Sequence, residues 1–483
     1  MTVLHEPTRS ATPQEHLDAV GRLLAKLHVA EGYAPRVAAG DTAGQAPLRS
    51  PIEQENLAEL RSRLDALHPA DVAFVLEGLP LDDRLVVWGL VRSDRDGEIL
   101  LEVSDAVRDT LLADMDSAEM VAAARTLDAD EIADLAPDLP QEVVQDIIES
   151  QDDEERAQLQ SALSYPEGSV GALMDFEMVS IRDDVTCEVA LRYLRRFEEL
   201  PVQTDALFVI DRHGHLQGSL PLKRLLVSDL ETPVEKLIDR EVITFLPDDD
   251  AGEAATAFER YDLVCAPVVA SDGRVIARLT VDSVLTYVRE RQEAQALGSV
   301  GLREEEDLFS SVWTSAKNRG PWLALNLCTA FVASRVVGAF EGSIEKLVAL
   351  AALMPIVAGI GGNSGNQTAA LIVRALALEK VSAANARRLL AKEAGIALLN
   401  GALWGGVLGV IAWALYDNVA LGGVMGLAML LNLLVAALAG LLIPLALERF
   451  GRDPAIGSSV FLTFVTDSMG FFIFLGLATA LLV

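Results

Sequence analysis

The chain has 483 residues, a hydrophobic fraction of 51% and a formal net charge of −32, so it is long enough for two to four domains. The charge is unevenly distributed. Residues 1–317 hold 29 basic and 63 acidic side chains, whereas the rest of the chain holds 10 and 8. An acidic surface repels nucleic acid and attracts cations, which argues against a nucleic-acid partner. A merely solvated acidic face would explain the same charge.

Residues 1–50 are predicted to be a mostly flexible extension with one helix near 13–29. The first residues, MTVLHEPTRSATPQEH, have neither the basic nor the apolar segment of a signal peptide. Cys187, Cys265 and Cys328 are far apart and show no metal-ligand spacing. This cysteine usage is typical of a reduced, cytosolic compartment.

Residues 51–165 are predicted to form a helical N domain. DVAFVLEGLPLDDRLVVWGLV (71–91) is similar to EIADLAPDLPQEVVQDIIESQ (131–151), and each places Leu-Pro between two amphipathic stretches. Repeated helical pairs of this kind favour a small α-solenoid.

Residues 166–290 contain a second internal repeat. LFVIDRHGHLQGSLPLKRLL (207–226) aligns with APVVASDGRVIARLTVDSVL (266–285), and Gly214 matches Gly273. Upstream, VSIRDDVTCEVALRYLRR and ITFLPDDDAGEAATAFER each predict a short strand and then a helix. This β-α-β-β-α unit resembles the CBS domain, so we assign 166–230 and 231–290 to a tandem pair. The resemblance makes the cleft of the pair a candidate ATP site, although it has no Gly-rich phosphate loop.

An all-α transmembrane domain at 319–483 is predicted to follow a connecting helix at 291–318. Five apolar segments are long enough to cross a bilayer, at about 321–340, 346–373, 394–416, 420–447 and 456–483. Lys and Arg concentrate before the first span, between the second and third, and between the fourth and fifth. This distribution predicts a multi-pass protein of the cell membrane with its N-terminus in the cytoplasm and its C-terminus outside.

The second predicted span carries a polar stretch, Gly361 to Thr368, in its middle. Its glycines are expected to loosen or break the helix, and backbone opened within a membrane must be buried in protein or line a wet cavity. We therefore interpret Asn363, Asn366 and Gln367 as lining a cavity. Close helix packing is the alternative, and it suits the glycines at 401, 405 and 409 better.

The fifth predicted span contains an ionisable residue, Asp467. Asp453 and the following proline are expected to start this helix, which would put Asp467 about 20 Å along it and deep in the membrane. A carboxylate at such depth is costly and indicates a functional site, and Thr463 shares its helix face. A salt bridge to Arg335 or Arg374 from another span is the alternative.

Asn432, in the fourth span, lies on a stripe with small residues, which fits either a pore-facing amide or close helix packing. Together with Asp467, Thr463 and the amides of the second span, it supplies neutral and anionic oxygen ligands. Such a set suits Mg²⁺, which keeps its waters and binds through few carboxylates. All six histidines precede residue 216, which disfavours zinc and copper, whereas Mn²⁺ and Co²⁺ stay open as substitutes.

The order of these parts resembles the MgtE family of magnesium channels and transporters, over about residues 55–483. The segments that carry the resemblance are YPEGSVGALM, PIVAGIGGNSGNQTAALIVRALAL, DPAIGSS and TFVTDSMGFFIFLGLAT. The resemblance implies a membrane-embedded homodimer with a pore at its axis and Asp467 as the selectivity carboxylate. It also implies that cytosolic Mg²⁺, bound between the N domain, the CBS pair and the connecting helix, closes the pore.

The expected gate differs from the family pattern in one segment. Asp282 is present, and Asp453 matches a position that can contact a gating ion in the family. Ser283, Thr286, Arg289, Arg291, Ala294 and Gln295 stand where the family resemblance implies acids. We therefore predict weakened Mg²⁺ gating, with salt bridges in place of metal bridges.

The sequence thus predicts a non-enzymatic protein that moves Mg²⁺ inward through a pore, with the cytosolic domains as a regulatory sensor. The chain has no G-x-x-x-x-G-K-[ST] motif, and an inward path needs no ATPase. Two alternatives stay open: a membrane-anchored CBS sensor that binds an adenine nucleotide without transport, and a coupled divalent-cation exchanger.

Overall fold

The computed structural model describes all residues except 1–11, 34–50, 303–307, 378–382, 453 and 455–456. It divides into two compact units. The first comprises Met1–Arg291 with Asp307–Phe309, and the second comprises Gln292–Glu306 with Ser310–Val483. The multidomain layout expected from the sequence, a helical N domain, a CBS pair and a helical C-terminal region, is confirmed.

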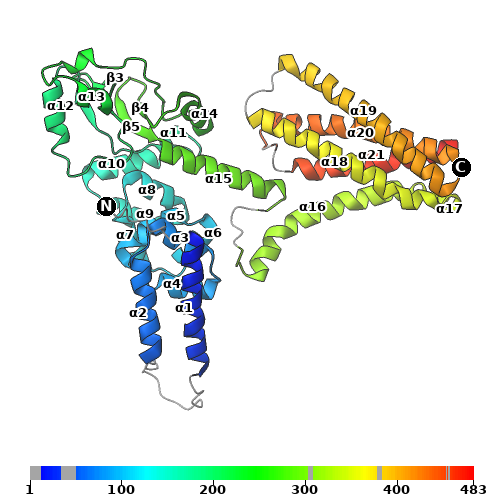
Figure 1. Ribbon diagram of the computed structural model, residues 1–483, viewed down its shortest axis with the longest axis horizontal. Helices are drawn as coiled ribbons and strands as arrows, with labels where there is room; N and C mark the ends of the chain where they lie inside the picture. The colour runs from blue at the N-terminus through cyan, green and yellow to red at the C-terminus, as the bar shows by residue number, and fades with distance from the viewer. Residues whose placement is uncertain (1–11, 34–50, 303–307, 378–382, 453, 455–456) are drawn as a thin grey trace, which may run out of the picture. The chain divides into compact units, whose positions relative to one another are not determined.

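Helices build the N-terminal part of the first unit, the first two of them long and the others short (Figure 1). They are α1 (Pro13–Tyr33), α2 (Pro51–Asp65), α3 (Pro69–Glu77), α4 (Leu81–Trp88), η1 (Ser93–Arg95), α5 (Asp96–Glu102), α6 (Asp105–Leu112), α7 (Ser117–Ala124), α8 (Ala129–Leu135), η2 (Ala136–Asp138), α9 (Gln141–Ser150) and α10 (Asp153–Ala162). Both Leu-Pro pairs separate two helices, as the repeat predicts, and Pro80 and Pro140 are the N-caps of α4 and α9. One continuous apolar core, from Val20 to Leu159, joins these helices.

The CBS pair consists of two small α/β parts. The first holds β1 (Ser180–Arg182), α12 (Cys187–Leu194), β2 (Ala206–Ile210), β3 (Leu216–Pro221), α13 (Leu222–Val227) and η3 (Val234–Lys236). The second holds α11 (Val170–Leu173), α14 (Ala251–Tyr261), β4 (Cys265–Val269), β5 (Val275–Thr280) and the start of α15 (Val281–Ser299). The first sheet has the order β1-β2-β3, with β1 parallel to β2, and the second pairs β4 with β5 antiparallel.

The matched glycines confirm the repeat in the CBS pair. Gly214 and Gly273 both have φ +86°, which only glycine adopts readily, and each lies in the turn two residues before the return strand of its hairpin. The two turns also bond to each other, because Leu216 N–H donates to Gly273 O and Val275 N–H to Gly214 O, both at 3.1 Å. The predicted first strand of the second repeat is wrong: among the described residues it is reduced to a single parallel bridge, Phe245 to Val268.

The second unit is a bundle of long helices. Its elements are α16 (Val312–Gly338), α17 (Glu341–Lys346), α18 (Ala349–Ala377), α19 (Ala383–Tyr416), α20 (Val419–Arg449) and α21 (Ser458–Leu481). Helix α20 packs against α18, α19 and α21, and α16 packs against α21. Within the described residues, four helices are long and apolar enough to cross a membrane: α16, α19 from Arg387 onward, α20 and α21.

Helix α18 corresponds to the second predicted span but does not count among those four, because its polar middle lowers its hydropathy. The prediction that its glycines break the helix is wrong, since α18 is unbroken for 29 residues. The glycines instead give room for neighbours. A Cβ on Gly361 would lie 2.2 Å from Asn432 Nδ2, and one on Gly365 would lie 2.9 Å from Leu462.

The packing interpretation of the third-span glycines is confirmed. A Cβ on Gly405 would meet the carbonyl oxygen of Gly426 at 2.6 Å, and one on Gly409 would meet that of Gly422 at 2.7 Å. Gly401 faces Leu430 in the same way, at 2.9 Å. These glycines let α19 and α20 approach at backbone distance, as small residues do between membrane helices.

Candidate ion path and cytosolic acidic pocket

Asp467 lies half-buried on α21, and its place along the helix differs from the prediction. The helix begins at Ser458 with Gly457 as its N-cap, so the predicted N-cap at Asp453 is wrong. Asp453 itself lies outside the described residues. Asp467 is nine residues into the helix, about 14 Å along it at 1.5 Å per residue.

The surroundings of Asp467 are apolar helices and small polar groups. Thr463, one turn earlier, is exposed on the single chain, and its hydroxyl donates to Ser459 O at 2.8 Å. Arg335 and Arg374 are both exposed, and no described residue forms an ion pair with Asp467. The salt-bridge alternative therefore has no support in the described part of the chain.

Helix α18 separates its polar side chains into two faces. Asn363, Asn366 and Gln367 are exposed on the single chain, whereas Gly361, Gly365 and Thr368 are buried against other helices. The helix thus packs through its glycines and presents its amides outward. Three amides on one outward face are available to a cavity, to a second copy of the chain or to lipid.

Asn432 does not share that exposed face, because its side chain is fully buried between α18 and α21. Its Nδ2 donates to Val357 O on α18 at 2.9 Å, while its Oδ1 has no partner among the described residues. Gly361 and Gly470 flank it, and a Cβ at either position would lie within 3 Å of Nδ2. The amide therefore joins three helices at one point.

A second buried polar contact joins α18 to α19. Glu393 is only 6% exposed, and Thr368 Oγ1 donates to its Oε2 at 3.2 Å. Sequence reasoning missed this carboxylate because the predicted third span began at residue 394. A charged residue placed at the end of a span is expected to reach solvent, and only its helical register could have indicated otherwise.

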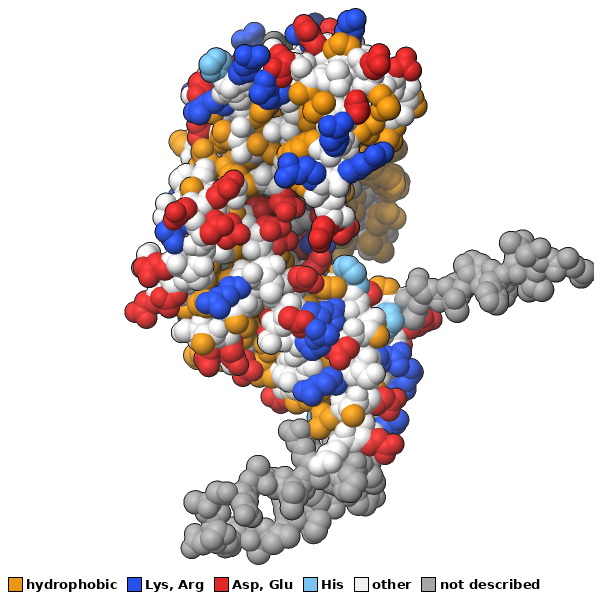
Figure 2. All heavy atoms as spheres, turned by 90° about the vertical axis from the view of Figure 1, so that its left-hand side faces the viewer, with side chains coloured by type: hydrophobic (Ala, Val, Ile, Leu, Met, Phe, Trp, Pro, Cys, Tyr) orange, Lys and Arg blue, Asp and Glu red, His pale blue; other side chains and the backbone are white. Residues whose placement is uncertain are grey.

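In the first unit, a pocket of about 240 Å³ lies between the N domain and the start of the CBS pair. Carboxylates of Asp128, Asp130, Glu155 and Glu177 line it, and none of the ten lining residues is Lys or Arg. Figure 2 shows acidic side chains gathered across the middle of the face that it presents.

Burial makes these pocket acids hold protons more tightly than usual. Burial, and then the charge of Asp175, raises the pKa of Asp130 to about 7. The same two causes raise the pKa of Asp128, and burial with the charge of Asp128 raises that of Glu177. No three such ligands among the described residues converge enough to hold a bare metal ion, so a cation here would be held partly through water.

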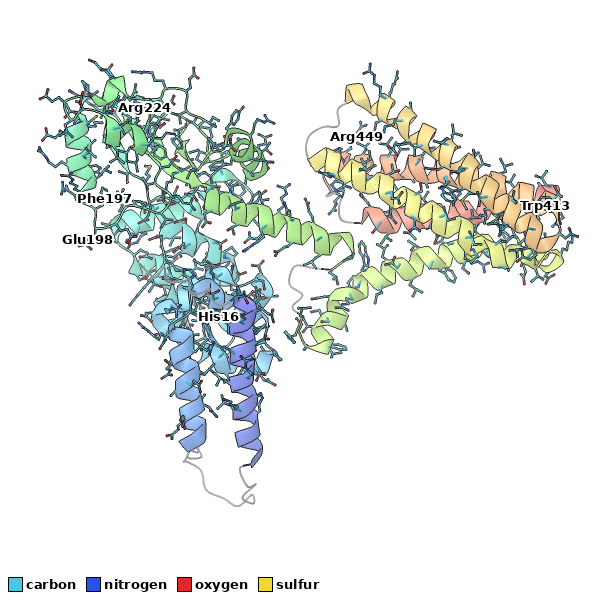
Figure 3. The ribbon with its side chains drawn as sticks, in the orientation of Figure 1. His16, Phe197, Glu198, Arg224, Trp413 and Arg449 are labelled. Carbon is cyan, nitrogen blue, oxygen red and sulfur yellow. The ribbon has the colours of Figure 1, made fainter. Side chains whose placement is uncertain are left out.

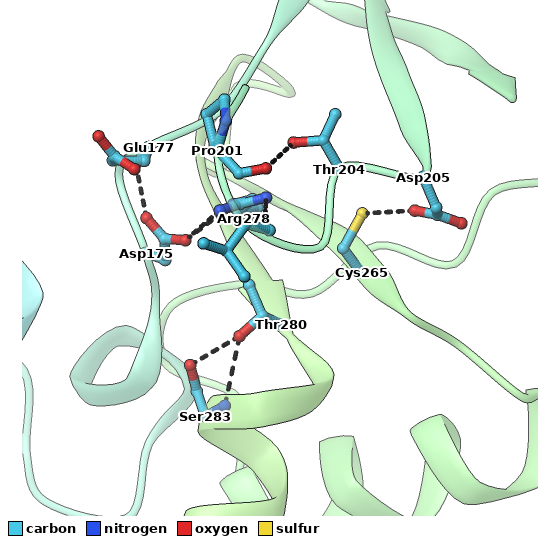
Figure 4. A network of polar contacts seen from close by, with 10 residues as sticks. Asp175, Glu177, Pro201, Thr204, Asp205, Cys265, Arg278, Thr280 and Ser283 are labelled. Atoms are coloured by element: carbon cyan, nitrogen blue, oxygen red, sulfur yellow. Dashed lines mark hydrogen bonds and ion pairs between the residues drawn. The ribbon is translucent and has the colours of Figure 1, made fainter. Parts of the chain in front are cut away.

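Beside the pocket, Asp175 is held by an arginine in a buried network (Figure 4). Arg278, on β5, contacts Asp175 Oδ2 through Nε and Nη2 at 2.8 and 2.7 Å, and its Nη1 donates to Val202 O. The same network places Cys265 Sγ 3.1 Å from Asp205, where burial and this carboxylate raise the pKa of the thiol to about 12. Arg278 thus ties the segment before β1 to the second CBS part.

The connecting helix starts within this unit. Asp282 is exposed in the first turn of α15, and no described residue forms a hydrogen bond or ion pair with its side chain. Further along, burial and the charges of Asp134 and Asp105 raise the pKa of Glu290 to about 7. Glu290 therefore lies in the electrostatic field of the N domain, which sequence reasoning missed.

Arg108 supplies the positive charge on the N-domain side. Its side chain is 6% exposed, and it contacts Asp138 at 2.9 Å, Asp105 at 3.6 Å and Asp134 at 4.0 Å. A guanidinium in the middle of three carboxylates neutralises charge that would otherwise need a cation from solution.

Comparisons with known proteins agree with this arrangement. Residues 354–477 match the profile of a family described as a divalent cation transporter, 67–168 match the MgtE intracellular N domain, and 234–290 match the CBS domain. The magnesium transporter MgtE of Thermus thermophilus is 31% identical over 445 residues, which cover 90% of this chain and 98% of that protein. The chain belongs to the MgtE family.

Other relatives extend the similarity. The magnesium transporter MgtE of Bacillus subtilis is 26% identical, over 89% of this chain and 95% of that protein. A crystal structure of the cytosolic domain of the Mg²⁺ channel MgtE in complex with ATP is 30% identical, with a TM-score of 0.44, over 48% of this chain and 98% of that one. The Thermus and Bacillus relatives are named magnesium transporters, which are not enzymes, so magnesium transport by a membrane protein is the function that the family supports.

Proposed function

We propose that this MgtE family member conducts Mg²⁺ through a pore at the axis of a homodimer, with one Asp467 from each protomer facing the ion. The observation that carries the proposal is a half-buried carboxylate on an apolar helix without an ion-pair partner among the described residues. Such a residue is costly in a membrane and is retained when it serves an ion.

The ligand chemistry around Asp467 fits a hydrated cation. Described residues offer no group of three side chains that could hold a bare metal, and Mg²⁺ gives up its waters reluctantly. Asp467 would attract the ion through its water shell. Thr463 and the outward amides Asn363, Asn366 and Gln367 would then accept or donate hydrogen bonds to those waters.

Asn432 has a different part in this proposal. Because it is fully buried within one protomer and bonds to Val357 O, it would shape the path by fixing α18 against α21. Its unpartnered Oδ1 would be available to a water or an ion only if the packing around Gly361 and Gly470 opened.

The driving force needs only the membrane potential. A divalent ion gains about 4.6 kcal/mol on entering a cell held at −100 mV, twice the value for one charge. For inward flux we propose that the N-terminus is cytoplasmic, the C-terminus lies outside, and α18 completes a set of five spans. Figure 3 shows Arg449 and Trp413 at opposite ends of the bundle, as expected for a basic cytoplasmic end and an aromatic residue at the other interface.

The test of the pore is Asp467→Asn, which removes the charge and keeps the size. In proteoliposomes that hold a Mg²⁺-sensitive dye, we expect influx to fall at least about tenfold, since a carboxylate at the ion position supplies more than about 1.4 kcal/mol. Glu345→Gln, on the exposed surface of α17, is the matched control and should keep wild-type influx. Wild-type influx in a folded, dimeric Asp467→Asn protein would overturn the assignment.

We further propose that the cytosolic unit senses Mg²⁺ weakly. Its candidate cation site is the acidic pocket lined by Asp128, Asp130, Glu155 and Glu177, and Asp282 and Asp453 are additional candidates. Arg108 and Arg278 already neutralise neighbouring acids, which leaves less for Mg²⁺ to bridge. Limited proteolysis with and without millimolar Mg²⁺ should therefore give little protection, and strong protection would contradict the proposal.

Two other functions remain distinguishable by experiment. A coupled exchanger would need a proton or Na⁺ gradient for Mg²⁺ movement, whereas a channel would not. A nucleotide at the CBS pair stays a prediction, and a sensor without transport would bind ATP while showing no Mg²⁺ flux. Competition with Mn²⁺ and Co²⁺ in the same liposomes would show whether they substitute for Mg²⁺.

A further inference from the structure

Glu393 is the most buried acidic side chain among the described residues of the helical bundle, and transport as proposed above does not use it. Its Oε2 accepts a hydrogen bond from Thr368 Oγ1 at 3.2 Å, and Thr368 is itself 6% exposed. The nearest described cation, Lys392 Nζ, lies 3.7 Å from Oε1 on a side chain that is 63% exposed. The carboxylate is therefore directed into the bundle and held there by one hydroxyl.

The contact falls where four helices meet. Gly440 of α20 lies so close to α18 that a Cβ would be 2.6 Å from Gly365 O and 2.9 Å from Thr368 Cβ. Gly365 in turn faces Leu462 of α21, at 2.9 Å from an added Cβ. Among the described residues, α18 thus makes apolar contacts with α20 and α21 and two polar contacts: its Val357 O accepts from Asn432 of α20, and its Thr368 side chain donates to Glu393 of α19.

Apolar contacts carry no directional preference of their own, and the close glycine contacts of α18 limit its rotation only sterically, where a Cβ turned into their place would clash. A hydrogen bond to a buried carboxylate is directional. Successive side chains of an α-helix point about 100° apart. A rotation of α18 by a fraction of that angle would therefore turn its amide face away from its present direction.

We propose that Glu393 is a positioning residue: through Thr368 it fixes the rotation of α18 so that Asn363, Asn366 and Gln367 face outward from the bundle. This inference rests on the proposed pore, because the direction of the amides matters for transport only if they line that pore. It assigns no ion contact to Glu393, because the carboxylate points to the inner side of α18, opposite to the exposed amides.

The test reads the orientation of α18 directly, through the rate at which a membrane-impermeant thiol reagent modifies Asn366→Cys. The full-length protein in liposomes is used, with Cys187, Cys265 and Cys328 replaced. Thr368→Val removes the donor and keeps the shape, and Glu393→Leu removes the acceptor. We expect each to change the modification rate about threefold or more, the equilibrium shift that a typical hydrogen bond between membrane helices supports.

The conservative variants should behave differently. Thr368→Ser keeps the hydroxyl, and Glu393→Gln keeps an acceptor oxygen without the charge. In both variants the cysteine of Asn366→Cys should therefore be modified at the parent rate. Glu345→Cys, exposed on α17, should react equally in all variants and so exclude general loosening of the bundle.

Three results would overturn the inference. They are an unchanged rate in both Thr368→Val and Glu393→Leu, a changed rate in Thr368→Ser, and loss of Mg²⁺ influx in Glu393→Gln at an unchanged rate, which would give the charge itself a role. Failure of the proposed pore is separate: it would appear as wild-type influx in Asp467→Asn, whatever the modification rates are.

Discussion

The acidic pocket predicts an unusual effect of removing one charge, Asp130→Asn. Burial raises the pKa of Asp130 from 3.8 to about 7. Above that pH the folded protein therefore holds an ionised carboxylate that is solvated less well than it would be in water. Three pKa units at about 1.4 kcal/mol each amount to about 4 kcal/mol, an upper figure for the gain in stability at pH 8 when Asn replaces Asp.

The pH dependence follows from the same shift. Because the pKa is higher in the folded state, folding favours the protonated acid. The stability that the protonated Asp130 adds to the folded state is complete below about pH 4 and is lost as the pH rises through about 7. Lowering the pH from about 8 to about 5.5 should therefore stabilise the wild-type unit by about 2 kcal/mol more than it stabilises Asp130→Asn.

The assay is urea unfolding of residues 1–291, which form a compact unit with their own apolar cores. Trp88 is the only tryptophan in this segment and is buried in the N-domain core, so its fluorescence reports unfolding. Asp153→Asn is the matched control, since Asp153 is fully exposed on α10. Equal stability of wild type and Asp130→Asn at pH 8, or a less stable variant, would refute the electrostatic reasoning.

Three further predictions concern other contacts. Arg278→Met leaves Asp175 as an unpaired buried carboxylate and should lower the stability of residues 1–291 by about 3–5 kcal/mol in the same urea assay; if pairing is the cause, adding Asp175→Asn should recover part of it. Gly440→Ala places a Cβ 2.6 Å from Gly365 O and should destabilise the purified full-length protein by about 1–3 kcal/mol in thermal unfolding, whereas Gly423→Ala on the same helix has open space and should not. Mg²⁺ should bind the cytosolic unit more weakly at pH 6 than at pH 8 by calorimetry, because protons compete for Asp130, and tighter binding at pH 6 would contradict the pocket as the cation site.

Much of the cytosolic unit could be predicted because its signals are local. The paired Leu-Pro stretches set helix starts at Leu81 and Gln141, and the matched Gly214 and Gly273 set two equivalent hairpins. The predicted strand before α14 failed for a reason that is not local. Among the described residues, Phe245 pairs with one strand, β4, through a single bridge, and no periodic pattern reveals the number of neighbours that a strand will find.

The membrane half shows a different limit. Glycines within an apolar segment are compatible with a broken helix or with a tightly packed one, and only the partner helices decide. Here Asn432, Leu462 and Gly440 fill the space that Gly361 and Gly365 leave, so α18 stays intact, and its intact form determines which amides face outward.

The burial of Glu393 could not be predicted for a similar reason. Its burial depends on a hydroxyl 25 residues earlier in the chain, Thr368, and on the rotation of α18 that brings the two together. The sequence could indicate which residue types a cation path needs. Which of them face the path depends on helix rotation, and in this bundle two buried polar contacts, Asn432 with Val357 and Glu393 with Thr368, are the directional interactions positioned to set it.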